Sequence, residues 1–94
     1  MVTMNTTVVA AESLSVADLG GESVVLDSQS GKYYGLNEVG ALVLELAQRP
    51  VTVAEITDSI QRQYDAPPDR IAEDVNVFLK DMISAELIKV VGEA

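Results

Sequence analysis

Short blocks of apolar and polar residues alternate over residues 23–37, and they predict a hairpin followed by a helix. The apolar residues 24–26 lead into a polar cluster at 27–31. The Ser-Gly ending of this cluster suits a tight reversal, because glycine adopts positive φ at little cost. Strand-favouring residues resume at 32–36 and stop at Asn37, a preferred helix N-cap. We therefore expect two antiparallel strands joined by a tight turn, with a helix beginning directly after the second.

The N-terminal part of the chain shows a weaker strand pattern. The β-branched residues at 6–11 predict a first strand, and a sparse apolar pattern at 14–16 precedes a glycine-rich turn at 18–22. The second strand then spans 23–27 and the third 32–36. Three strands in succession predict an antiparallel meander.

A first helix is expected over residues 37–48, ended by Arg49 and Pro50. Leu44 lies off its apolar stripe. The stripe itself comprises the residues at helical spacing on one face, Val39, Leu42, Val43, Leu46 and Ala47.

Two further helices are indicated by their start signals. Thr52 and Glu55 form a capping box, and Val51 can pack onto Ile56 as a hydrophobic staple. Pro68 suits the first turn of a third helix, the longest, which reaches to about Ala85. The apolar side of the second helix comprises Val53, Ile56, Ile60 and Tyr64.

The third helix carries an apolar stripe and an unusual flank. One border places Val77 between two carboxylates, Asp74 and Asp81. Such a border is compatible with a groove wall, but without a partner in view a solvated flank that bears one exposed valine is the more common case. After this helix, residues 87–91 form an apolar tail that packs against the helices or along the sheet. The expected core stripe comprises Ile71, Val75, Phe78 and Met82, widened by Leu79 and Ile83.

Composition excludes several functions. At 94 residues, the sequence is long enough for one small domain, 1–94. It contains no cysteine and no histidine, which excludes thiol catalysis and removes the commonest metal ligands, so we expect no metal site and no cofactor. No apolar run approaches the length of a membrane span and no basic N-terminal signal is present, so we expect a cytoplasmic protein without membrane association.

The formal charge of −9 also limits the partners. Six Lys and Arg residues are scattered among fifteen Asp and Glu residues, whereas nucleic-acid binding requires a basic face. We therefore expect no nucleic-acid binding. A basic peptide suits this charge better, although acidity can serve solubility alone.

The order and spacing of these residues resemble the PqqD-like family. The resemblance covers roughly residues 24–90, and its elements are short but ordered. The order of elements corresponds to a winged helix-turn-helix-like α+β fold, with a three-stranded antiparallel sheet followed by three helices. Two departures occur: Ala85-Glu86 stands where many relatives carry a glycine, and Gly35 replaces a larger residue. The residues that carry the resemblance are 25–27, 30–40, Leu42, Leu46, 52–56, Asp74-Val75, Phe78-Leu79 and Leu87-Ile88.

This resemblance implies a non-catalytic recognition element for ribosomally synthesised precursor peptides. The chain looks most like the stand-alone leader-binding protein of a lasso-peptide pathway, which delivers the precursor to a transglutaminase-like cysteine protease. In this family the leader lies as an added strand on the third strand, beside the third helix. With the leader in this position, the peptide-binding residues that we expect are Lys32, Tyr33, Tyr34, Gly35, Leu36, Asp74, Val77, Phe78, Asp81 and Met82.

Strand alternation separates the two tyrosines. Tyr33 and Gly35 lie on one face, whereas Tyr34 and Leu36 lie on the other. Leu36 is the better core residue, so we expect Tyr34 to point inward beside it and Tyr33 to point outward.

Four other functions are considered. A PqqD-type peptide chaperone that serves a radical SAM enzyme is the nearest related role. The order of elements also permits a winged-helix DNA-binding regulator, although the helix from Thr52 offers one Arg and two Gln, and the last helix is net acidic. A structural subunit docked on a large enzyme would require an exposed apolar patch. Catalysis by the chain itself lacks a candidate nucleophile or base near the carboxylates.

Overall fold

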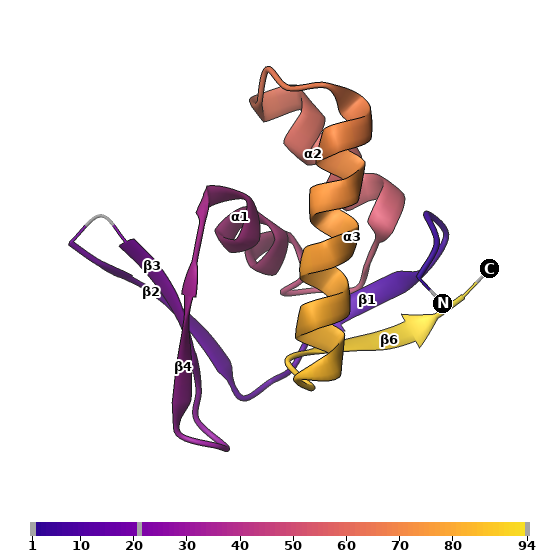
Figure 1. Cartoon of the computed structure of the whole chain (residues 1–94). Helices are drawn as coiled ribbons and strands as arrows, with labels where there is room; N and C mark the ends of the chain where they lie inside the picture. The colour runs from indigo at the N-terminus through magenta and orange to yellow at the C-terminus, as the bar shows by residue number, and fades with distance from the viewer. Residues whose placement is uncertain (1, 21, 94) are drawn as a thin grey trace.

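The computed structural model of the chain describes residues 2–20 and 22–93 (Figure 1). Its fold is α+β, with three helices and two three-stranded antiparallel sheets. The elements follow in the order β1 (Thr7–Ala10), β2 (Leu14–Leu19), β3 (Glu22–Asp27), β4 (Lys32–Leu36), α1 (Glu38–Leu46), β5 (Val51–Thr52), α2 (Val53–Gln63), α3 (Pro68–Ser84) and β6 (Ile88–Gly92).

The two sheets correct the predicted meander. We call β2-β3-β4 the meander sheet and β5-β1-β6 the terminal sheet. The expected strand at 6–11 exists as β1, but it pairs with β5 and β6 rather than with β3. The sparse pattern at 14–16 belongs to β2, which takes that place beside β3. A two-residue connection makes β2 the nearer partner, because closing a short loop costs less chain entropy than closing a long one.

The turn between β3 and β4 confirms the predicted hairpin. Gly31 has a φ of 75° and its N–H donates to the Asp27 carbonyl at 2.8 Å. The Asp27 carboxylate accepts hydrogen bonds from the Gln29 N–H at 3.1 Å and from the Ser30 hydroxyl at 2.9 Å. The turn is therefore stabilised by its own polar residues, as the sequence predicts.

The three helix starts are also confirmed. Asn37 Oδ1 accepts from the Gly40 N–H at 2.7 Å, and Thr52 Oγ1 accepts from the Glu55 N–H at 3.1 Å. Pro68 opens α3, and Ala85 is its C-cap. Because each start depends on residues within one turn, local sequence is sufficient to place it.

The core lies where the helices meet both sheets. Its centre on α3 is Leu79, which the predicted stripe treats as an edge residue, while Phe78 and Met82 are only half-buried. Leu44 is fully buried, so its predicted place off the stripe is wrong. The reason is that α1 contacts α2, α3 and all three strands of the meander sheet, which requires an apolar arc wider than one stripe.

The apolar tail forms β6 and lies along a sheet, one of the two predicted arrangements. It pairs antiparallel with β1, and its first residue, Ile88, is buried in the core next to Leu87. Figure 1 shows the meander sheet on one side of α3 and the terminal sheet at the lower end of this helix. No helix in the described part of the chain is long and apolar enough to cross a membrane.

Candidate functional site

The strand β4 lies at the edge of the meander sheet. It pairs with β3 from Lys32, opposite Asp27, to Leu36, opposite Ser23, and in residues 2–20 and 22–93 no strand pairs with its other side. An edge strand presents a row of N–H and C=O groups that can pair with another extended chain. The predicted residues 32–36 therefore form an accessible hydrogen-bonding edge.

A hollow of about 340 Å³ lies between α3 and the start of α1, which directly follows β4, and we call it the Phe78 hollow. Four predicted residues line it together: Asp74, Val77, Phe78 and Asp81. Val77 is 55% exposed, so an apolar side chain faces this hollow. An exposed Val77 fits both interpretations of this border, the groove wall and the solvated flank. The other lining residues, which the sequence analysis missed, are Asn37, Val39 and Glu73.

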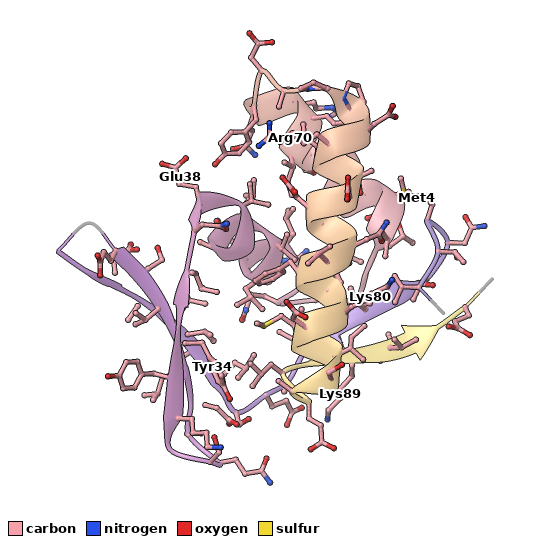
Figure 2. All side chains as sticks on the ribbon, in the orientation of Figure 1. Met4, Tyr34, Glu38, Arg70, Lys80 and Lys89 are labelled. Atoms are coloured by element: carbon pink, nitrogen blue, oxygen red, sulfur yellow. The ribbon has the colours of Figure 1, made fainter. Side chains whose placement is uncertain are left out.

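A second hollow of about 270 Å³ lies at the start of β4, and we call it the Tyr34 hollow. It brings Lys32 and Tyr34 together with Ala85 and Glu86, which follow α3. Figure 2 shows Tyr34 directed from β4 toward α3. The two hollows lie at opposite ends of β4, and both face α3 or its C-terminal end. We call them together the β4–α3 groove. The remaining lining residues are Asp27, Gln29 and Ser30.

The two tyrosines face opposite sides, as predicted. Tyr34 is half-buried and packs against the core together with Leu36. Tyr33 is 71% exposed and stands opposite Leu26 on the outer face of the meander sheet. Gly35 alternates with Tyr34, so the open space beside its Cα belongs to the outer face rather than to the groove. Tyr33 and Gly35 can thus contribute to the groove edge only through their backbones.

Phe78 is held in place by α1. A Cβ atom at Gly40 would lie 2.8 Å from Phe78 Cε1, which is closer than real side chains approach. A glycine at this position lets the ring pack directly against the helix backbone. Met82 also packs against the core, but it lines neither hollow. Of these two predicted residues, Phe78 lines the groove, whereas Met82 belongs to the packing around the core.

Carboxylates dominate the charge of the groove. Glu73, Asp74 and Asp81 surround the Phe78 hollow, while Asp27 and Glu86 face Lys32 across the Tyr34 hollow. A hydrogen bond with the Ser13 side chain lowers the pKa of Asp27 below its usual value, and bonds with Ser30 and the Gln29 N–H lower it further. The Asp27 carboxyl is therefore ionised at neutral pH.

A hydrogen bond between two side chains links α2 to α1 beside the Phe78 hollow. The Tyr64 hydroxyl donates to Glu38 Oε2 at 3.3 Å, which joins the end of α2 to the first turn of α1. Partial burial raises the pKa of the Tyr64 phenol, and the nearby Glu38 carboxylate raises it further. The phenol stays neutral and can serve as donor.

The absence of a glycine after α3 was the sequence signal that could have identified Glu86 as a site residue. Glu86 has a φ of 62°, a left-handed conformation that favours glycine, and the sequence analysis had noted the absence of a glycine at residues 85–86. Asn37 was identified only as a helix cap, although it also lines the Phe78 hollow. In residues 2–20 and 22–93, no group of three or more Asp or Glu side chains is placed to hold a metal ion.

Solved structures resemble this chain over most of its length. The complex of TbiB1 with the TbiA(beta) leader peptide shares 26% sequence identity, covers 90% of this chain and 99% of that chain, and has a TM-score of 0.75. The lasso peptide synthetase B1 complexed with the leader peptide shares 20% identity over 87% of this chain and 96% of that chain, with a TM-score of 0.73.

A third similar structure is the PqqD truncation of Methylobacterium extorquens PqqCD, a stand-alone RiPP recognition element. It shares 18% identity over 95% of both chains, with a TM-score of 0.79. Among curated protein sequences, none matches this chain significantly. The family model for coenzyme PQQ synthesis protein D (PqqD) matches residues 22–88, which include the meander strands β3 and β4 and all three helices. The chain therefore belongs to the PqqD family.

Proposed function

We propose that this protein recognises the leader of a ribosomally synthesised precursor peptide, which it binds as an added strand on β4. The observation that carries the proposal is an unpaired edge strand with hollows at both ends, each facing α3 or its C-terminal end. Two of the similar structures contain a leader peptide, which supports this choice of ligand. The proposed pathway is lasso-peptide biosynthesis, by likeness to the lasso peptide synthetase B1.

The binding mode follows from strand geometry. Backbone groups of Lys32–Leu36 pair with the leader and fix its register, while alternate leader side chains point into the groove. Those side chains meet Tyr34 at one end and Val77 and Phe78 at the other. Main-chain pairing supplies affinity that is independent of sequence, and the apolar walls supply selectivity.

The charge of the groove favours a leader with cationic residues. Asp74 and Asp81 flank Val77 and remain exposed, so a leader lysine or arginine can approach either one. Exposed pairs of this kind contribute about 0.2–1 kcal/mol each. Charge therefore adjusts specificity and association rate, while the apolar contacts and the strand pairing provide most of the affinity.

The protein itself performs recognition and not catalysis in this proposal, and it delivers the bound precursor to a leader peptidase of the transglutaminase-like cysteine protease class. The outer face of the meander sheet supports this role. Leu26 and Tyr33 lie opposite each other on this face, exposed and uncharged, on a protein of charge −9. A leader on the β4 edge leaves this face accessible, so a second protein can dock there while the leader is bound.

The test is a calorimetric titration with the leader encoded beside this gene. We expect one-to-one binding with a Kd near or below about 1 μM, or about −8 kcal/mol. Single N-methyl groups along the leader should abolish binding at alternate residues only, because every second N–H of an added strand faces β4. Uniform sensitivity or uniform tolerance to N-methylation would exclude the added strand.

A matched pair of protein variants locates the site. Val77→Ser on α3 should weaken leader binding, whereas Val91→Ser on β6 should leave it unchanged. The two valines are equally accessible in the free protein, with 55% and 53% of their surface exposed. Equal effects of the two substitutions would place the leader elsewhere.

A further inference from the structure

A third hollow of about 580 Å³ lies at the C-terminal end of α3, and it is larger than the Phe78 hollow and the Tyr34 hollow. We call it the basal hollow. Its walls come from the β1–β2 connection, the end of α3 and the start of β6. Figure 2 places Lys89, one of its rim residues, beside this end of α3. Neither the sequence analysis nor the proposed strand pairing assigns it a role.

Hydrogen bonds to both sheets fix the wall of this hollow. The Ala11 N–H donates to the Leu87 carbonyl at 2.9 Å, which ties the β1–β2 connection to the start of β6. The Ser13 carbonyl accepts from both the N–H and the hydroxyl of Ser28, each at 3.0 Å, which ties the same connection to the β3–β4 turn. The hollow is thus built into the junction of the two sheets.

The basal hollow continues the β4–α3 groove. Gln29 and Glu86 line both the basal hollow and the Tyr34 hollow. A peptide strand that leaves β4 at Lys32 therefore passes these two residues and reaches the basal hollow within a few residues.

The residues that line the basal hollow favour one kind of peptide side chain. Ile83 and Ile88 provide an apolar floor, and the carboxylates of Glu12 and Glu86 stand at the rim with Lys89 as the single cation. A long side chain with an apolar stem and a cationic tip matches this arrangement, because its methylene groups can cover the isoleucines while its charge meets the carboxylates. Lysine and arginine have this form.

We propose that the basal hollow is a second subsite for the precursor peptide, and that it receives a Lys or Arg side chain from the residues adjoining the added strand at the Lys32 end. This inference rests on the proposed function, and it specifies which further part of the peptide the protein reads. A peptide limited to the added strand would then use only part of the binding surface.

The test compares two leader peptides on two proteins. One peptide covers the β4-pairing segment alone, and the other extends beyond it at the Lys32 end and carries its natural Lys or Arg residues. In the unmodified protein the extension should improve affinity about 3- to 10-fold, the range expected for one or two accessible charge contacts. In the double variant Glu12→Gln/Glu86→Gln the improvement should disappear. Glu12→Gln alone, which changes the basal hollow and no residue that lines the β4–α3 groove, should reduce the improvement while affinity for the short peptide stays the same.

Controls separate this subsite from general electrostatic attraction. The double variant Glu45→Gln/Glu55→Gln makes the same change in net charge on α1 and α2, outside the basal hollow, and should keep the full effect of the extension. An extended peptide with norleucine in place of its Lys or Arg residues should lose most of the improvement.

Three results would overturn the inference. An extension effect that survives Glu12→Gln/Glu86→Gln would show that the hollow is not used, while the added strand would stand. If that variant sedimented at a different rate but kept the full effect of the extension, the hollow would instead be a contact between two copies of the chain. Failure of both peptides to bind the unmodified protein would refute the proposed function and this subsite together.

Discussion

The two sheets of this protein have the same number of strands but different surroundings. In the terminal sheet Val8, Val51 and Ile88 are buried in the core, one from each strand. In the meander sheet Val25 is the only buried side chain among those that the structure describes, and Leu26 and Tyr33 are exposed on the outer face. The terminal sheet is thus part of the hydrophobic core, whereas the meander sheet is attached to it mainly through one face.

This difference suggests a division of roles, in which the terminal sheet stabilises the fold and the meander sheet carries the proposed peptide-binding edge. Burial of apolar side chains is the main source of folding free energy, so the terminal sheet and the helices above it should carry most of the stability. The meander sheet holds β4 at the protein surface, with its edge open and its inner face against α1. In the proposed function β4 has to keep one edge unpaired to accept a peptide, and it can do so where it contributes less to the core.

Truncating an aliphatic side chain in each sheet should give the largest difference in the free energy of unfolding. Ile88→Ala in β6 should reduce the free energy of unfolding by about 2–5 kcal/mol, because Ile88 is buried in the core. Leu26→Ala in β3 should change it by less than about 0.5 kcal/mol, because 44% of Leu26 is exposed. Urea unfolding of both variants measures the contrast. Similar losses would mean that the meander sheet is as integral to the core as the terminal sheet.

A smaller effect is expected where α1 meets the groove. Gly40→Ala places a Cβ against the Phe78 ring, and the cost of overpacking, about 1–3 kcal/mol, exceeds the gain in helix propensity of about 1 kcal/mol. The ring must shift, so leader affinity should fall together with stability. Ala41→Gly is the control, since it lowers stability by about 1 kcal/mol through lost helix propensity, at a residue that lines a hollow beside β2. If both variants bound the leader equally well, Phe78 would not form part of the binding wall.

Replacing Glu86, which has a left-handed backbone conformation after α3, with glycine should stabilise the protein modestly. Glu86→Gly should raise the free energy of unfolding by about 1 kcal/mol, because a φ of 62° strains any residue with a Cβ. Glu86→Ala removes the same carboxylate but keeps the strain, so its stability should not rise. Thermal unfolding of the two variants distinguishes the backbone from the charge. An equal gain in both would assign the effect to repulsion among the carboxylates.

The smallest effect is a pH dependence in the β3–β4 turn. The pKa of Asp27 is lowered in the folded protein, so its ionised form stabilises the turn at pH values above its ordinary value of 3.8. This contribution is lost as the pH falls through the lowered pKa of the folded state. Denaturation of the protein and of Asp27→Asn between about pH 5 and about pH 2 measures it, and the difference between them should shrink with acidification. A constant difference would show that the carboxylate charge does not contribute.

Local signals explain what the sequence predicted correctly. The Asn37 and Thr52 caps and the turn ending at Gly31 each depend on contacts within a few residues. The pairing of β1 was mispredicted because its partner, β6, lies at the other end of the chain, and no local pattern records such a contact. Leu44 was misplaced because helical spacing describes one buried face, while α1 is packed on several sides.

In the candidate site, too, the features set by local sequence could be predicted and those set by long-range contacts could not. The alternation of Tyr33 and Tyr34 and the flank around Val77 could be read from periodicity, and the family resemblance joined them. The basal hollow could not be predicted, because the β1–β2 connection, the β3–β4 turn and β6 come together only in three dimensions. Glu86 was visible as a departure from the family pattern, yet its place between two hollows depends on the fold.

The most direct test of the account is amide hydrogen exchange of the protein with and without its leader peptide. The two edges of the meander sheet provide an internal comparison, since among the strands that the structure describes β2 and β4 each pair only with β3. Added-strand binding predicts new protection at alternate amides of Lys32–Leu36, while the amides of Leu14–Leu19 keep the rates of the free protein. Protection that appears on β2, or on neither strand while the leader is bound, would contradict recognition at the β4 edge.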